Sequence, residues 1–190
     1  MPLRNTQDRY GSVARAAHWL AALLILGGFS LALYMTDLPL SPQRLKLYSW
    51  HKWIGVTVLL LALLRLLWRG ITHAPPLPGH MPAWEQAAAR LSHWTLYALM
   101  LATPVAGWLM SSAKGFQTVY FGVLPIPDLL EKNPPLGKTL AEVHEILAWT
   151  LIALVAVHAA AALKHHFRDR DAVLAGMLPG VTPPSRDRKP

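Results

Sequence analysis

The sequence contains no cysteine. A chain without thiols forms no disulfide, no thiolate-ligated iron–sulfur cluster and no zinc–thiolate site, and it lacks the C-x-x-C-H motif that attaches haem covalently. Charge is also scarce, at 15% of 190 residues, compared with about 25% in an ordinary soluble domain. With 53% hydrophobic residues and a mean hydropathy of +0.30, the composition is typical of a membrane protein.

Four uncharged apolar stretches predict four membrane-spanning helices. A helix needs about 20 predominantly apolar residues to cross a bilayer. Only the second stretch is short, so the second span must carry Arg65 within or at the edge of the membrane. The first stretch is too long for a signal-peptide core and lacks a clear cleavage site, so we expect it to be retained. The expected helices cover residues 12–36, 48–69, 88–113 and 140–168.

These helices predict an all-α integral membrane protein with a single four-transmembrane-helix domain at residues 8–178. The tail at 179–190 is charged and rich in proline, so we expect it to be flexible. Twelve of the eighteen lysines and arginines lie before the first span, around the connection of the second and third spans, or after the fourth. The positive-inside bias therefore predicts that both termini are cytoplasmic. Basic residues beside apolar spans usually meet membrane lipid, so we expect no nucleic-acid binding.

Four of the nine histidines lie inside the predicted helices: His18, His51, His144 and His158. An ionisable residue within a span needs a partner there and indicates a functional site, although a hydrogen-bonded interior histidine remains an alternative. His144 and His158 are 14 residues apart, which is about 21 Å of helix rise and almost four turns, so they project from one face at two depths. The direction of each helix places His18 level with His158, and His51 level with His144.

Two imidazoles that face each other across a helical bundle suit a flat iron macrocycle, because haem iron takes axial ligands from opposite faces. A zinc site needs three or four ligands at one place, which makes zinc the weaker alternative. Small residues near the histidines leave space for a porphyrin or reflect ordinary close packing of helices. They are Gly55, Ala156, Ala159 and Ala160.

The order and spacing of several motifs resemble the bacterial cytochrome b561 family, and within it the di-haem superoxide oxidase type. The motifs are Arg15-Ala-Ala-His18-Trp19, His51-x-x-x-Gly55, Pro104-x-x-Gly107, and His144 followed by His158-Ala-Ala-Ala-Ala-Leu-Lys-His165-His166. The resemblance implies a four-helix bundle in the bacterial inner membrane that encloses two b-type haems. It assigns His18 and His158 to one haem, and His51 and His144 to the other. It also implies electron transfer from superoxide at the periplasmic side to ubiquinone near the cytoplasmic side.

The same resemblance points to residues near the cytoplasmic ends of the helices as quinone contacts. His165 is one, although a snorkelling residue at the membrane interface is the alternative interpretation. The family often has a basic residue six positions before the first haem ligand, where this chain has Ser12. Trp84 and Glu85, at the entry of the third helix, occupy the place of the other quinone contacts.

Arg65 follows His51 by 14 residues, so both lie on one face of the second helix. The spacing predicts that Arg65 points into the bundle toward a haem propionate or the quinone pocket, with Arg69 or Arg15 assisting. The alternative is an arginine that snorkels to lipid headgroups. His93 also lies inside a helix, but the two pairs leave it no depth-matched partner, so we expect it to support another ligand or to face the quinone.

Lysines on the outer side allow two functions. Lys114, Lys132 and Lys138 are the candidate catalytic residues, because clustered positive charge attracts an anionic substrate such as superoxide. The same charges could dock an acidic redox protein partner. The alternative function is thus a haem-bearing membrane anchor that relays electrons between quinone and a separate dehydrogenase or hydrogenase subunit. A cofactor-free transporter ranks third.

Overall fold

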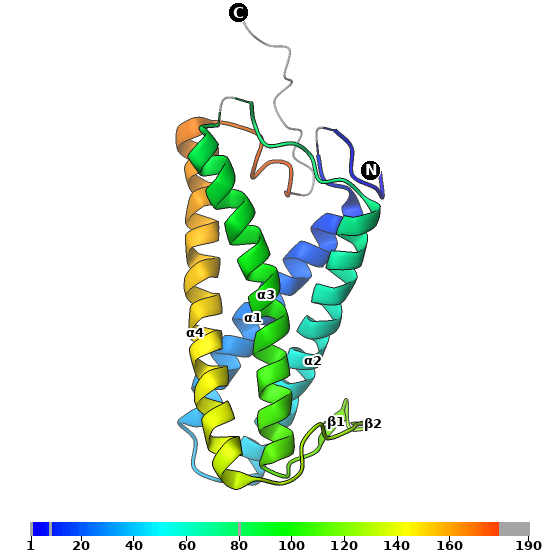
Figure 1. The fold of residues 1–190 in the computed structure, drawn as a ribbon, viewed down its shortest axis with the longest axis vertical. Coiled ribbons are helices and arrows are strands. Elements are labelled where there is room, and N and C mark those ends of the chain that lie inside the picture. The colour runs from blue at the N-terminus through cyan, green and yellow to red at the C-terminus, as the bar shows by residue number, and fades with distance from the viewer. Residues whose placement is uncertain (1, 8, 80, 179–190) are drawn as a thin grey trace, which may run out of the picture.

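The computed structural model describes residues 2–7, 9–79 and 81–178, and it shows a bundle of four long helices (Figure 1). The helices are α1 (Ser12–Thr36), α2 (Pro42–Ile71), α3 (Ala83–Ala113) and α4 (Pro134–Lys164), and α4 continues into a π-helical turn, η1 (His165–Asp169). All four helices are long and apolar enough to cross a membrane. The chain is therefore a multi-pass membrane protein, as the composition predicts.

Three helices start earlier along the chain than the apolar stretches suggest, and α3 begins at Ala83 rather than at residue 88. The hydroxyl of Ser41 accepts a hydrogen bond from the amide of Arg44, and α2 begins at Pro42 rather than at residue 48. The side chain of Asn133 likewise accepts from the amide of Leu136, and α4 begins at Pro134 rather than at residue 140. A polar cap followed by proline is a typical helix start. The polar first turns extend α2 and α4 beyond their apolar stretches.

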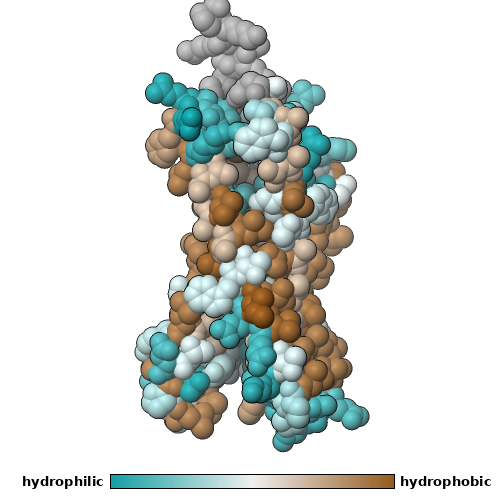
Figure 2. All heavy atoms as spheres, turned by 60° about the vertical axis from the view of Figure 1, so that its left-hand side comes forward, coloured by the Kyte–Doolittle hydropathy of each residue, from teal (hydrophilic) through white to brown (hydrophobic). Residues whose placement is uncertain are grey.

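The interior of the bundle is built largely from small and aliphatic side chains. Its buried cluster consists of Ala21, Val58, Ala62, Leu99, Met100 and Leu151. Small residues let helix backbones approach closely, which is how helices associate in a membrane. Large apolar side chains such as Leu23, Leu64 and Val157 point outward and are exposed. Figure 2 shows hydrophobic residues along the middle of one face and hydrophilic residues mainly toward the two ends, as a lipid-embedded bundle requires.

A small antiparallel hairpin lies in the connection between α3 and α4. Its strands are β1 (Thr118–Tyr120) and β2 (Leu124–Ile126), and Figure 1 shows it beside α2 at the end opposite the N-terminus. We call this end the outer end and the opposite end, where α1 begins and α4 finishes, the inner end. The indole of Trp53 donates to the carbonyl of Val119 at 2.7 Å, and the hydroxyls of Thr57 and Tyr120 are 2.9 Å apart. These bonds fix the hairpin against α2.

The chain after η1 turns back across the inner end of the bundle. Arg170 adopts a left-handed conformation, with φ of 53°, which redirects the backbone at the end of η1. The buried guanidinium of Arg15 then donates to the carbonyl of Leu178 at 3.0 Å, and the indole of Trp19 donates to the carbonyl of Met177 at 2.9 Å. Both bonds join the last described residues to α1. The expected tail at 179–190 lies outside the described residues.

Candidate functional site

The structure brings the four histidines together in the two expected pairs. The ring centroids of His18 and His158 are 6.2 Å apart, with an angle of 46° between the ring planes. The ring centroids of His51 and His144 are 6.1 Å apart, with an angle of 89°. Each pair joins α4 to a different helix, α1 at the inner level and α2 at the outer level.

Main-chain carbonyls orient both histidines of the outer pair. Nδ1–H of His51 donates to the carbonyl of Gly28 at 3.0 Å, and Nδ1–H of His144 donates to the carbonyl of Thr103 at 2.9 Å. A carbonyl can only accept, so both rings carry their proton on Nδ1 when neutral, and the lone pair of Nε2 is free. A histidine that ligates a metal typically donates its other ring N–H in this way. In the inner pair, Nδ1 of His18 is buried and has no hydrogen-bond partner among the described residues.

The ring separations fit two axial imidazoles on one metal. A metal–imidazole bond of about 2.0 Å places each ring centroid about 3.1 Å from the metal, so two axial rings have centroids about 6.3 Å apart. Both observed separations are close to this value. The paired rings, the free Nε2 atoms and the oriented Nδ1 atoms of the outer pair therefore fit axial ligation of haem iron.

Glycines explain how the rings of the outer pair reach their positions. A Cβ atom on Gly107 would lie 3.0 Å from Cε1 and 3.1 Å from Nδ1 of His144. A Cβ on Gly28 would lie 2.9 Å from Cγ2 of Ile54, so this glycine allows α1 to approach α2 closely enough for its carbonyl to reach His51. The Pro104-x-x-Gly107 motif thus has a direct role in placing His144.

His93 belongs to the inner level, where His158 is already paired with His18. Its ring centroid lies 5.4 Å from that of His158, closer than the ring of His18. The donor atoms of these three histidines do not converge on one point as a metal site would require, as judged from the described part of the chain. Helix periodicity could have placed His93 on the inward face of α3. Pairing the histidines by depth alone gave His93 no partner.

Arg65 also lies inside the inner level. Its guanidinium donates to the carbonyl of Ala17 at 3.3 Å and lies over the ring of Tyr97, with 5.7 Å between the guanidinium carbon and the ring centroid. Arg65 therefore points into the bundle beside His18, as its spacing from His51 predicts. Close by, burial raises the pKa of the Tyr10 phenol, although the positive charge of Arg69 offsets part of this effect.

A pocket of about 280 Å³ opens at the inner end, between the start of α3 and η1. It is lined by Met81, Pro82, Glu85, Lys164, His165 and Asp169. Two of the expected quinone contacts, Glu85 and His165, thus share one pocket. Ser12 and Trp84 are not among its lining residues: Trp84 is 69% exposed, and the hydroxyl of Ser12 lies near the carbonyl of Pro2.

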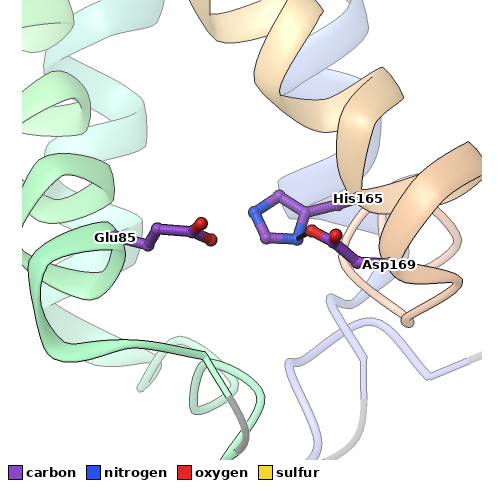
Figure 3. A group of neighbouring side chains, drawn as sticks. All are labelled: Glu85, His165 and Asp169. Atoms are coloured by element: carbon purple, nitrogen blue, oxygen red, sulfur yellow. Dashed lines mark ion pairs between the residues drawn. The ribbon is translucent and has the colours of Figure 1, made fainter.

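Carboxylates hold the ring of His165. Its Nδ1 is 2.7 Å from Oδ2 of Asp171 and 3.1 Å from Oδ2 of Asp169. Figure 3 shows the imidazole pointing toward the carboxylate of Glu85 on α3. The side chain of His165 is only 11% exposed, so it does not snorkel to water. Sequence reasoning missed both aspartates, although the four-residue spacing of His165 and Asp169 on a helical segment was a visible signal.

At the outer end, the structure gathers the three candidate lysines around the connection of α3 and α4. The side chain of Lys132 lies against Gly115, and the side chain of Lys114 lies against Gly137, which precedes Lys138. All three lysines are exposed. The same end holds an open pocket of about 510 Å³ on α4. Its lining residues are Glu142, Glu145, Ile146, Trp149 and Thr150, and the first two are acidic.

Known proteins are similar to this chain over nearly its whole length. The family model described as prokaryotic cytochrome b561 matches residues 9–180. Cytochrome b561 homolog 2 of Escherichia coli (strain K12) is 37% identical over 180 residues, which cover 94% of this chain and 95% of that protein. The probable superoxide oxidase CybB of Yersinia pestis is 29% identical over 175 residues, which cover 90% of this chain and 96% of that protein. Each match spans nearly the full bundle.

Proposed function

The chain belongs to the prokaryotic cytochrome b561 family of membrane electron-transfer proteins, and from this premise we propose that it oxidises superoxide and reduces ubiquinone. The observation that carries the proposal is the pair of histidine levels on α4, with the His165 pocket beyond the inner level. Superoxide reacts at the outer end, on the periplasmic side of the bacterial inner membrane. The inner end, where the described chain begins and ends, faces the cytoplasm with both termini as the positive-inside bias of the sequence predicts.

The family implies b-type haem, and we propose two haems per chain, held by His18 with His158 and by His51 with His144. Bound haem would supply a one-electron carrier at each level, and the two imidazoles of each pair would hold it. The protein's own part is to hold each ring pair in place. The carbonyls of Gly28 and Thr103 do this at the outer level, and Arg65 adds a positive charge next to His18 at the inner level.

The overall reaction requires both ends of the bundle. Two superoxide anions each lose one electron and leave as dioxygen, while one ubiquinone takes up two electrons and two protons to become ubiquinol. Exposed Lys114, Lys132 and Lys138 raise the local concentration of the anion at the outer end. At the inner end, Asp171 accepts from Nδ1–H of His165, so Nε2–H of the imidazolium form can donate to a quinone carbonyl and pass its proton to it.

A second function is supported by the acidic pocket at the outer end. Glu142 and Glu145 line it, and their negative charges oppose the attraction of an anion while suiting a basic face of a protein partner. In this alternative the protein is a haem-bearing membrane anchor that relays electrons between quinone and a separate dehydrogenase or hydrogenase subunit.

Stopped-flow mixing of the oxidised, haem-loaded protein with superoxide separates the two functions. A superoxide oxidase should show haem reduction faster than spontaneous dismutation, and added ubiquinone should reoxidise the haem. A relay anchor should be reduced by ubiquinol but not by superoxide alone. No reduction above the dismutation background would exclude superoxide as the electron donor.

A further inference from the structure

We propose that the pocket at the inner end binds a divalent transition-metal ion of the zinc class, with Glu85, His165 and Asp169 as its protein ligands. Each of these half-buried residues offers one ligand atom, and the three atoms lie within 4.8 Å of one another. Within the described part of the chain, no other group of this kind is found. The ligands come from two segments, the start of α3 and the turn η1, so a bound ion would join them.

The donor set selects the class of metal. One imidazole and two carboxylates suit zinc and neighbouring first-row ions, which bind nitrogen and oxygen donors at about 2.0–2.2 Å. Magnesium and calcium favour oxygen ligands, so the imidazole discriminates against them. The 4.8 Å limit is wider than the spacing of ligands around a zinc ion, which means that the side chains must close in slightly. The carboxylate of Asp169, now 3.1 Å from Nδ1 of His165, must turn toward Nε2, and Glu85 must move inward within the pocket of about 280 Å³.

Asp171 gives His165 the support that metal-binding histidines usually have. Its Oδ2 accepts from Nδ1–H of His165 at 2.7 Å, and its Oδ1 accepts from the amide of Val173 at 2.9 Å. The Asp171 side chain is almost fully buried, so the carboxylate is held in position. A carboxylate behind the imidazole orients the ring and raises its strength as a ligand. With Nδ1 engaged, Nε2 is the atom available to a metal.

A cation already sits between the two ligand carboxylates. Nζ of Lys164 is 2.7 Å from Oε1 of Glu85 and 3.0 Å from Oδ2 of Asp169. This contact shows that the two carboxylates favour positive charge between them. The Lys164 side chain is 37% exposed and flexible, so an incoming divalent ion can displace it toward water. Lys164 is therefore a built-in competitor of the metal, and its removal should tighten binding.

The effect of the metal on catalysis rests on the proposed function. A metal on Nε2 of His165 and a quinone carbonyl would compete for the same atom. Metal binding should therefore inhibit reoxidation of the haem by ubiquinone and leave its reduction by superoxide unaffected.

The test is calorimetric titration of zinc into the full-length, haem-loaded protein, prepared without a polyhistidine tag. We expect one zinc ion per chain, with magnesium unable to compete. Glu85→Gln and Asp169→Asn should each weaken binding about tenfold or more, and Lys164→Met should tighten it about tenfold. Arg168→Met removes a nearby positive charge that lies outside the cluster, and His166→Asn removes an exposed neighbouring imidazole. Both controls should change affinity less than about twofold. An unchanged haem spectrum shows that each variant is folded.

Three results would overturn the metal site. They are no single-site binding, equal affinity in the parent and Glu85→Gln, or tightening by Arg168→Met as large as that by Lys164→Met. If zinc binds with the expected pattern of variants but quinone still reoxidises the haem at the same rate, the metal site stands. The quinone would then have to be placed elsewhere.

Discussion

At the scale of single residues, the outer histidines are positioned by groups that carry no side-chain chemistry. The carbonyls of Gly28 and Thr103 accept from the two imidazoles, and the missing Cβ of Gly107 makes room for one of them. A sequence motif of glycine near histidine predicts such a site. It cannot show which carbonyl accepts the hydrogen bond of each ring or which glycine makes room for it. The two histidine pairs were therefore predictable from depth, whereas the tautomers of the outer rings and the place of His93 required coordinates.

Gly107→Ala is expected to weaken the outer haem site. The added Cβ would lie 3.0 Å from Cε1 of His144, which forces the ring to move. Alanine favours a helix over glycine by about 1 kcal/mol, so a loss of haem cannot be attributed to a weaker helix. The haem content per chain, measured as the pyridine haemochrome, should fall toward one. Gly27→Ala is the matched control, because nothing lies within 4 Å of its added Cβ; equal haem contents in the two variants would contradict this role of Gly107.

His18→Ala and His158→Ala should each remove the inner haem and leave the outer haem largely intact, because the two pairs share no residue. The haemochrome assay should give about half of the parent's haem, and the remaining spectrum should stay low-spin, as two imidazole ligands require. His93→Ala tests the third ring at this level and should retain both haems. If His18→Ala kept the inner haem and His93→Ala lost it, the ligand role would belong to His93 instead.

At the scale of elements, α4 sets the spacing of the whole site. It carries His144 and His158 on one face and leads directly into η1, which presents His165 and Asp169 to the start of α3. The apolar stretches predicted four helices and the depth of each histidine. They did not predict the starts of α2 and α4, since caps at Ser41 and Asn133 lie in polar sequence. The hairpin and the return of the chain after η1 depend on long-range contacts, which periodicity does not contain.

Trp19→Phe tests whether the segment after η1 holds the inner end together. Phenylalanine keeps an aromatic ring but removes the N–H that donates to the carbonyl of Met177. The loss should cost about 1 kcal/mol of stability, which corresponds to a fall in Tm of about 2–4 °C for a chain of this size. Thermal unfolding in detergent measures it. Trp84→Phe, at an exposed indole, is the control and should leave Tm unchanged; equal shifts in both variants would show that the segment adds nothing to stability.

At the scale of the whole molecule, charge is distributed differently at the two ends. Among the described residues, the inner end holds most of the lysines and arginines; Lys164 is in ion pairs there, and Arg65 and Arg69 lie over aromatic rings. The outer end presents Lys114, Lys132 and Lys138 in exposed positions, near two glutamates of the pocket on α4. Whether the outer end attracts an anion or a protein depends on which of these charges dominates.

The rate of haem reduction by superoxide should fall as ionic strength rises. Attraction by exposed lysines is screened, with a Debye length of about 10 Å at 0.1 M salt. Replacing Lys114, Lys132 and Lys138 together with methionine should slow this reduction by up to about tenfold at low salt and flatten its salt dependence. Reduction by ubiquinol at the inner end serves as the internal control and should not change. A salt dependence as steep in the triple variant as in the parent would exclude these lysines as the source of the attraction.

The spacing of the two histidine levels on α4 also has an electrical consequence. In the proposed orientation, each electron passes inward over about 21 Å of helix rise, which is roughly two thirds of a hydrocarbon core about 30 Å thick. The cytoplasm of an energised cell is negative, so this movement works against the voltage. A full crossing costs about 2.3 kcal/mol per 100 mV, and this partial crossing therefore costs about 1.6 kcal/mol per 100 mV. Turnover would charge the membrane, and a rising membrane voltage would oppose further turnover.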